Sequence, residues 1–482
     1  MTTAIGRHPD DAGRLRSGLL ALYAAPNLAL VIMHMPVYLV LPAYYAKHTQ
    51  ISLAAIGTVL LVGRLYDAIV DLLLGVLSDR TETRIGGRKP WILAGIPIAC
   101  VAVIQLFTPP ADAGTLYFLV WSVLLFSAWT MIDIPYAAWG AELSRHYDER
   151  SRIMTVRGTA GLAGAVLFMA APILLSPLTG TTAIGSEMLA ISAWAVALSL
   201  PLLMGLAVWR VPAGPNVAVR KASLRSILDA LRDNRPLRLY SGVVLGHGAA
   251  AGAWSATVLL FCDSIGLGAQ FPLLLLVAWT TRVLVAPLWL KLLYRFGKHR
   301  VWAVGAAASG IVTPLALLVP AGESALPLIL VYSLALGFIE TAWMVAPSSI
   351  LGDITDYDTL KTGADQAGAY FAFNALLMKV SAAIGGGVAF WVLGLLDYNV
   401  KGSNSGTQLL GLHLSFAILP AAIYVLCAVA IWWFPIDARR HSIIRRRIEA
   451  RARRQQIKAG HADAAAGGAT FPPQRLSQTT PA

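Results

Sequence analysis

Residues 53–78 read LAAIGTVLLVGRLYDAIVDLLLGVLS, an apolar run with only three charged side chains. A helix needs about 20 mostly apolar residues to cross the hydrocarbon core of a bilayer, so this run predicts a membrane span. Eleven more runs of this kind occur along the chain. The twelve predicted spans are residues 19–45, 53–78, 91–108, 115–142, 154–176, 187–209, 237–262, 270–294, 301–320, 325–351, 367–396 and 409–434. We expect each span to be helical, because the sequence lacks the alternating ten-residue segments of a barrel.

The composition of the whole chain agrees with a membrane protein. Of its 482 residues, 57% are hydrophobic and 13% are charged, whereas soluble proteins carry about 25% charged residues. These values exclude a soluble enzyme, a disulfide-rich secreted domain and a disordered chain, and the three cysteines show no metal or disulfide spacing. The net charge is +13, and the positions of the charged residues, rather than their sum, indicate membrane topology and not nucleic-acid binding. We therefore predict an all-α membrane protein without a nucleic-acid partner.

Lysine and arginine residues occur in alternate connections between the predicted spans. They occupy the N-terminus, the connections after the second, fourth, sixth and eighth spans, and the tail. The other set of connections holds only Lys47 and Lys401. Because cytoplasmic connections are enriched in lysine and arginine, we predict that both termini are cytoplasmic and that the protein lies in the cell inner membrane.

A basic segment divides the spans into two sets of six, and the two sets share motifs. Pro135–Gly140 in the first set and Pro347–Gly352 in the second are each followed by a Tyr-Asp pair. A parallel repeat of six and six spans, with a solute site between the halves, is typical of major facilitator transporters. The predicted organisation is a cytoplasmic N-terminus (1–18), two pseudo-symmetric six-helix halves (19–209 and 237–434), a linker (210–236) and a basic tail (435–482). Residues 459–482 are predicted to be disordered.

Three ionisable residues lie on one face of the second span. Arg64, Asp67 and Asp71 are spaced i, i+3 and i+7, which places them on the same side of a helix. A charge at the centre of a membrane helix costs about 2.5–3.5 kcal/mol on insertion scales. Two carboxylates one turn apart repel each other, so at least one is protonated unless a cation lies between them. This face is therefore predicted to bind H⁺ or Na⁺, and a static ion pair with Arg64 is the alternative.

Other polar residues also lie inside predicted spans. Thr130 in the fourth span offers a hydroxyl oxygen to a cation, and Asp133 either contacts solute hydroxyl groups or pairs with Arg157. Lys379 in the eleventh span is an ammonium group that needs an acidic partner. The aspartates of the second and fourth spans are the candidate partners, and snorkelling of the lysine to the membrane surface is the alternative.

Several residues give weaker signals. Glu340 is a second candidate proton site or a residue near a helix end, and Arg282 is a possible partner for the second span. His247 is interpreted as an ordinary polar residue within a helix. Tyr136 and Trp343 flank the expected cleft, where such aromatic rings either contact a sugar or pack in the core.

The motifs together resemble the glycoside–pentoside–hexuronide:cation symporter family of the major facilitator superfamily, of which the melibiose permease is the best-known member. The resemblance rests on RLYDAIVD at 64–71, RIGGRKPW at 84–91, DIPY at 133–136 and DITDY at 353–357, together with Lys379. It covers residues 20–435. It implies a twelve-helix carrier that moves a solute together with H⁺ or Na⁺ by alternating access.

The residue types and the resemblance together give the predicted site. The predicted cation-binding residues are Asp67, Asp71 and Thr130. The predicted substrate-binding residues are Asp133, Arg157, Lys379, Tyr136, Trp343 and Asn374. Five residues near the basic loops are expected to form salt bridges that hold an outward-open state, namely Asp79, Arg88, Arg145, Asp353 and Asp356. No cofactor is predicted, and no metal beyond possible Na⁺ at the two aspartates of the second span.

Four positions depart from the family pattern. Val70 replaces the asparagine of sodium-using members, and because an amide oxygen strengthens a Na⁺ shell, H⁺ is slightly preferred as the coupling ion. Val31, Ala137 and Met344 replace an aspartate and two aromatic residues of the family's sugar site. The predicted site is therefore less polar than a disaccharide pocket. A related branch of the family carries lysophospholipids with sodium, so a more amphipathic solute is an open alternative.

We therefore expect a monomeric, cation-coupled symporter that imports a glycoside or a related small solute and contacts membrane lipids. A cation-coupled lysophospholipid carrier and a proton-driven exporter of amphipathic compounds are the alternatives. We do not expect an enzyme, because the sequence shows no nucleophile–base set, metal cluster or phosphate-binding loop.

Overall fold

The computed structural model describes residues 15–144, 147–213, 231–363 and 367–466. Within these residues the regular structure is entirely helical, without a β-strand. Twelve of the helical segments are long and apolar enough to cross a membrane. The predicted all-α membrane fold with twelve spans is therefore confirmed.

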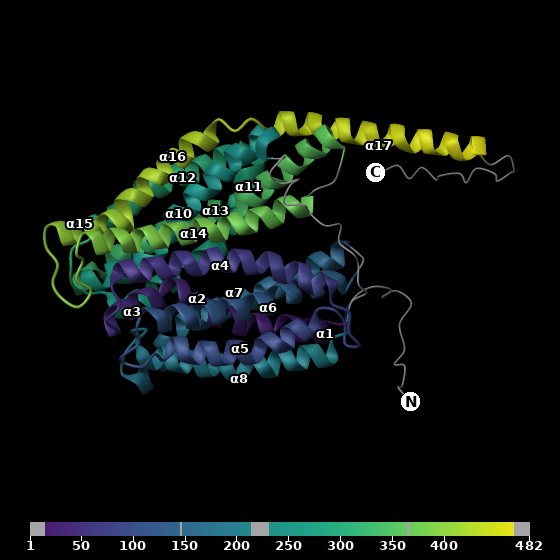
Figure 1. Cartoon of the computed structure of the whole chain (residues 1–482). Coiled ribbons are helices and arrows are strands. Elements are labelled where there is room, and N and C mark those ends of the chain that lie inside the picture. The colour runs from purple at the N-terminus through teal and green to yellow at the C-terminus, as the bar shows by residue number, and fades with distance from the viewer. Residues whose placement is uncertain (1–14, 145–146, 214–230, 364–366, 467–482) are drawn as a thin grey trace.

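The spans form two bundles that lie against each other (Figure 1). The first bundle, here called the N-terminal half, contains α1 (Ser17–Ala24), α2 (Pro26–Leu39), α3 (Leu41–His48), α4 (Leu53–Arg80), α5 (Lys89–Phe107), α6 (Thr115–Glu142), α7 (Tyr147–Thr179) and α8 (Ser186–Arg210). The second, the C-terminal half, contains α10 (Arg235–Ser264), α11 (Phe271–Phe296), α12 (Lys298–Leu315), α13 (Leu326–Thr362), α14 (Ala367–Leu395), α15 (Thr407–His413), a π-helical turn (Leu414–Ile418) and α16 (Leu419–Trp432). The helix α17 (Ala438–Ala466) follows the last span.

Proline residues divide the first predicted span into three helices. Pro26 begins α2, and Pro42 lies in the first turn of α3, where a missing N–H group leaves no helical hydrogen bond unmade. Between α2 and α3, Val40 departs from helical geometry, with φ −124° and ψ −52°. The span predicted near residues 19–45 is present, but its helix is interrupted at Val40 and its apolar stretch ends at Leu39. Only α1 and α2 form the span, and α3 lies beyond it.

The two ends of the bundle differ in charge. One end, here called the basic end, carries Arg80, the N-terminus of α5 and the helix α17 (Figure 1, right). The other end, here called the opposite end, carries α3 and α15 together with Lys47 and Lys401. This separation repeats the pattern of basic and non-basic connections seen in the sequence.

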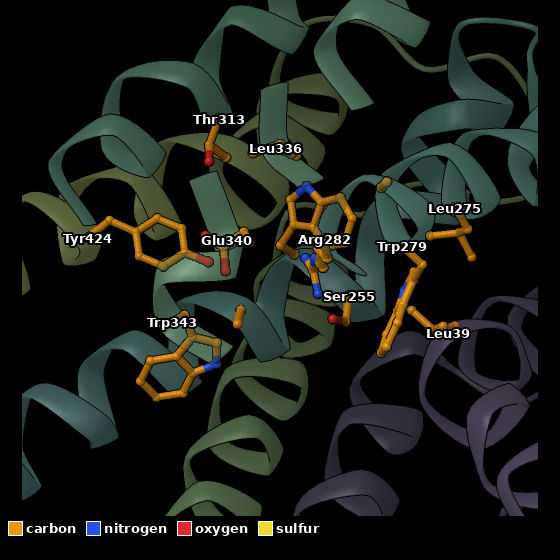
Figure 2. Close-up of a pocket in the computed structure, with 13 residues that line it drawn as sticks. Leu39, Ser255, Leu275, Trp279, Arg282, Thr313, Leu336, Glu340, Trp343 and Tyr424 are labelled. Carbon is orange, nitrogen blue, oxygen red and sulfur yellow. The ribbon is translucent and has the colours of Figure 1, made fainter. Parts of the chain in front are cut away.

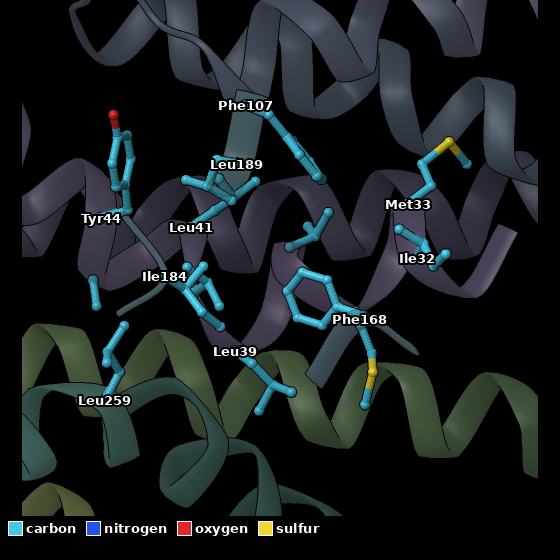
Figure 3. Close-up of a cluster of buried hydrophobic side chains, with 14 of the residues drawn as sticks. Ile32, Met33, Leu39, Leu41, Tyr44, Phe107, Phe168, Ile184, Leu189 and Leu259 are labelled. Carbon is cyan, nitrogen blue, oxygen red and sulfur yellow. The ribbon is translucent and has the colours of Figure 1, made fainter. Parts of the chain in front are cut away.

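The two halves pack closely at the opposite end. There α4 and α14 lie side by side (Figure 1). A Cβ atom added at Gly57 of α4 would lie 2.7 Å from the carbonyl oxygen of Gly387 on α14, so backbone meets backbone. A buried apolar cluster also crosses the boundary, because Leu259 of the C-terminal half lies with Leu39 and Ile184 of the N-terminal half (Figure 3).

The tail differs in part from its prediction. Disorder was predicted from residue 459 onward, but α17 continues to Ala466, and residues 467–482 lie outside the described residues. The alanine-rich sequence after Ala459 explains the difference, because alanine has the highest helix propensity. At its start α17 packs on α13, where Ile444 is buried and His441 Nε2 lies 2.9 Å from Asp356 Oδ2.

Candidate functional site

The three predicted cation-binding residues lie together in the middle of the N-terminal half. Asp67 and Asp71 project from α4 toward α6, where the Thr130 hydroxyl lies 3.1 Å from Asp67 Oδ1 and 2.8 Å from Asp71 Oδ1. Asp67 is only 1% exposed and Thr130 is fully buried. A single hydroxyl donates one hydrogen bond at a time, so Thr130 alone does not satisfy both carboxylates. This group of three residues is here called the ion seat.

Two cationic side chains complete the surroundings of the ion seat. Arg64 Nη1 lies 3.3 Å from Asp67 Oδ2, one turn away on α4. Lys379 of α14 forms an ion pair with Asp71, and its Nζ lies 3.3 Å from Asp67 Oδ2. The lysine thus reaches across from the C-terminal half and places a positive charge between the two carboxylates. Because buried carboxylates are stable only when paired or protonated, the lysine takes the position that a bound cation would need.

Asp133 and Arg157 form a second ion pair on the same side of the N-terminal half. Their pair joins α6 to α7. The guanidinium of Arg157 also stacks on Tyr136, with 4.6 Å from Cζ to the ring centroid. The structure therefore brings these two predicted substrate-binding residues together. Tyr136 is fully buried beneath Arg157, and its hydroxyl donates to the backbone oxygen of Tyr23, so in this state its role is to support the arginine.

The other two predicted substrate-binding residues lie within the C-terminal half, apart from the ion seat. Trp343 of α13 stacks on His247, with ring centroids 4.1 Å apart and planes 10° from parallel. Asn374 of α14 accepts a hydrogen bond of 2.7 Å from the Tyr240 hydroxyl. Asn374 is buried, so its described contact ties α14 to α10.

A cavity of about 240 Å³ lies between the halves, beside the ion seat. Arg64, Tyr38 and Leu60 form its wall on the N-terminal half, and small residues such as Ala382 and Gly386 form the wall on the C-terminal half. Arg64 stacks on Tyr38, with 3.8 Å from Cζ to the ring centroid. A solute in this cavity would contact a guanidinium group that is itself bonded to the ion seat.

The described contacts of the predicted gating residues lie within single halves. Arg88 donates to Glu142 (3.0 Å) and Ser78 (2.9 Å), all in the N-terminal half. Asp353 pairs with Lys298 at 2.6 Å, and Asp356 pairs with His441, both in the C-terminal half or its tail. Arg145 and the side chain of Asp79 lie outside the described residues. The expected salt bridges across the basic end therefore stay a prediction.

Contacts that the sequence analysis missed close the opposite end. Lys47 of α3 forms an ion pair with Asp263 at the end of α10. Lys401 donates to the Thr49 carbonyl at 2.9 Å, and Trp391 donates to the Thr58 hydroxyl at 3.1 Å. The two lysines were noted only as markers of topology.

Comparison with known proteins agrees with this architecture. The family model "MFS/sugar transport protein" matches residues 22–438. Putative glycoside/cation symporter YagG of Escherichia coli is 26% identical over 428 residues, covering 85% of this chain and 90% of that protein. Sodium-dependent lysophosphatidylcholine symporter 1 of Gallus gallus is 24% identical over 441 residues, covering 82% of each. A mutant of the nucleoside transporter NupG matches in structure with a TM-score of 0.67 and 14% identity, over 87% of this chain and 100% of that one, which supports the shared fold.

Proposed function

Because this chain belongs to the MFS/sugar transport family and is a multi-pass secondary transporter, we propose that it couples the import of a glycoside or related small solute to a cation. The observation that carries this proposal is the contact of Lys379 with both aspartates of the ion seat. An amine from one half lies on a carboxylate pair from the other half. Occupation of that pair therefore affects how the halves are held together.

The coupling step that we propose is an exchange of Lys379 for the cation. A cation bound to Asp67, Asp71 and Thr130 neutralises the carboxylates and releases the lysine. The free ammonium then becomes a hydrogen-bond donor for a solute in the cavity between the halves. In this proposal the two states of the carrier differ in the position of the lysine. The cation shifts the equilibrium between them only to the extent that it binds one state more tightly than the other.

We further propose that the coupling ion is H⁺ and that the basic end is cytoplasmic. The described ligands of the ion seat are two carboxylates and one hydroxyl, with valine at position 70 in place of an amide. A proton needs only a titratable carboxylate, whereas Na⁺ needs a shell of several oxygens. The basic end agrees with the enrichment of lysine and arginine in cytoplasmic connections. The state described here, closed at the opposite end, then corresponds to a carrier closed toward the outside.

The ion seat is tested by replacing Asp71 with asparagine and measuring thermal unfolding of the purified protein. Because H⁺ is the proposed coupling ion, we expect a lower pH to raise the unfolding temperature of the unaltered protein, and NaCl, compared with choline chloride, tests Na⁺ as the alternative. We expect Asp71→Asn to lose this response, because it removes one of the two carboxylates.

The matched control is Asp397→Asn, which removes an exposed carboxylate in the connection after α14. A full cation response in Asp71→Asn would contradict the proposed ion seat. If the unaltered protein responds to neither Na⁺ nor pH, the coupling proposal itself fails.

The apolar character of the cavity favours a second candidate, a cation-coupled lysophospholipid carrier. Tyr38, Leu60 and alanine and glycine residues line much of the cavity, and a relative is named a lysophosphatidylcholine symporter. Ligand-induced shifts in unfolding temperature distinguish the two candidates. Stabilisation by short-chain glycosides but not by lysophosphatidylcholine favours the glycoside, and the reverse result favours the lipid. The direction of transport is tested separately, because accumulation against an opposed proton gradient would indicate an exporter.

A further inference from the structure

A second group of ionisable residues lies within the C-terminal half, separate from the ion seat. Arg282 of α11 and Glu340 of α13 line a cavity of about 120 Å³ (Figure 2). His247 of α10 lies behind Glu340, with its Nε2 atom 3.6 Å from Glu340 Oε2. Charged residues inside membrane spans are costly, so this group calls for a function or for complete internal pairing.

Glu340 is already engaged by the protein. Its Oε1 atom accepts a hydrogen bond of 2.6 Å from the Ser309 hydroxyl, and its Oε2 atom faces His247. The residue is 7% exposed. Both carboxylate oxygens thus have polar neighbours in the C-terminal half.

Arg282 is not engaged in this way. Its Nε atom is buried and has no hydrogen-bond partner in the described part of the chain, and the described ion-pair partner of Glu340 is His247 rather than this arginine. The other cations near mid-membrane differ, because Arg64, Arg157 and Lys379 each form an ion pair with an aspartate. A guanidinium group has five donors in a planar fork that matches a carboxylate.

Aromatic rings surround the space in front of Arg282. Trp279 lies against the guanidinium, with 5.3 Å from Cζ to the ring centroid. Trp343 and Tyr424 stand on the other side of the cavity, beside Glu340 (Figure 2). Tryptophan and tyrosine faces bind flat apolar groups by dispersion and stacking. The pocket therefore combines surfaces for a ring with an unpaired donor for an anionic substituent.

This pocket adjoins the cavity beside the ion seat. Ala251 and Ser255 of α10 line both cavities. A group bound at Arg282 therefore lies next to a solute in the cavity between the halves.

We propose that the pocket at Arg282 binds an aromatic carboxylate portion of the transported solute. This inference rests on the proposed transport function, which it extends by naming part of the solute. The ring lies between Trp279 and Trp343, and the carboxylate pairs with the guanidinium of Arg282. Glu340 keeps its hydrogen bond from Ser309 and its position beside His247, and in the described structure it forms no ion pair with the arginine.

The test uses anthranilate, a fluorescent aromatic carboxylate, and anthranilamide, its neutral counterpart of nearly the same shape. Both absorb where tryptophan emits, so binding in the pocket is followed by energy transfer from tryptophan in the purified full-length protein. We expect saturable binding of anthranilate about tenfold or more tighter than binding of anthranilamide, because a hydrogen bond to a charged group is stronger.

Three variants separate the roles of the residues. Arg282→Gln is expected to remove the preference for anthranilate, and Arg282→Lys, which keeps the charge but lacks the planar fork, is expected to reduce it. Trp279→Leu is expected to weaken both probes equally. The matched control is Arg295→Gln on the same helix, at an exposed position, which should leave both affinities unchanged. If Arg282→Gln does not fold, Arg282→Lys decides the result.

Equal affinity for the two probes in the unaltered protein would overturn the inference, as would absence of saturable anthranilate binding. An unchanged preference in Arg282→Gln or Arg282→Lys would also overturn it. The assay contains no ion gradient, so its failure leaves the proposed coupling intact. Conversely, if anthranilate binding depends on Arg282 but the unfolding temperature changes with neither Na⁺ nor pH, the proposed coupling is refuted and the pocket at Arg282 is not.

Discussion

Replacing Lys379 with glutamine tests whether this lysine competes with the coupling cation. Its Nζ atom lies 3.3 Å from Asp67 Oδ2 and also pairs with Asp71. At an effective dielectric constant of about 20, the attraction at this distance is about 5 kcal/mol before the cost of removing water from the charges. Lys379 is 28% exposed, so solvation recovers part of that attraction when the lysine leaves. We therefore expect displacement of the lysine to cost about 1.4–2.7 kcal/mol of the free energy of cation binding. This cost lowers the apparent affinity for the cation about 10- to 100-fold.

Thermal unfolding as a function of Na⁺ concentration and of pH measures this competition. In cation-free buffer near neutral pH, Lys379→Gln should unfold at a lower temperature than the unaltered protein, because two carboxylates lose a shared counter-charge. Added Na⁺ or acid should then stabilise the variant more strongly, with half-maximal effect at a concentration about 10- to 100-fold lower. Lys291→Gln, at an exposed position on α11, is the matched control.

The opposite outcome is equally clear. If Lys379→Gln binds the cation with unchanged or weaker affinity, the lysine supports the bound cation or is irrelevant to it. The exchange of lysine for cation would then be refuted, even if the ion seat itself were correct.

Three further predictions concern glycine contacts between helices, the ion pair at the opposite end and the docking of α17. Gly57→Ala should keep the thermal stability but hinder closure of the opposite end, because its Cβ would lie 2.7 Å from a backbone oxygen of the other half. Gly385→Ala, whose Cβ would lie 1.8 Å from a backbone oxygen of its own half, should lower the unfolding temperature; equal unfolding temperatures would contradict this distinction. Asp263→Asn removes the ion pair with Lys47 at the opposite end. In a protein that also carries Gly386→Cys, it should raise the rate at which a water-soluble maleimide labels the cysteine about two- to fivefold, the effect of one partly exposed ion pair. An unchanged rate would show that this ion pair does not help to close the opposite end. Ile444→Ser should speed hydrogen exchange in α17 by undocking it at a cost of about 2 kcal/mol, whereas the exposed Ile443→Ser should not.

The membrane spans were predictable because hydropathy depends on local sequence alone. Their ends were less predictable. α7 begins at Tyr147 rather than near 154, and α13 continues to Thr362 rather than ending near 351. Both helices extend beyond the apolar run into polar sequence, where hydropathy no longer marks the helix but backbone hydrogen bonding continues it. The break at Val40 was missed because Pro42 is tolerated in the first turn of a helix and Pro36 lies inside α2 without ending it.

The candidate site was predictable where chemistry demanded a partner. A lysine deep in a span requires an acid, and the structure places Lys379 on the aspartates of α4; the cation-binding role of those residues stays a prediction. The burial of Tyr136 and the pairing of Lys47 with Asp263 were not predictable. They depend on how each helix is rotated and how the two halves meet, and a single sequence carries no direct signal for either.

The position of Lys379 on the ion seat also affects how the carrier changes state when no solute is bound. Without Lys379, the two carboxylates of a vacant carrier would have only Arg64 as a described cationic neighbour, and moving the remaining negative charge through the membrane interior is costly. In the proposed mechanism Lys379 and Arg64 together neutralise the two carboxylates, so the vacant carrier can return to its other state. Net accumulation, rather than mere swapping of one solute molecule for another, depends on that return. Lys379→Gln should therefore reduce the accumulation of solute more strongly than the exchange of one solute molecule for another, which loses only the proposed ammonium donor.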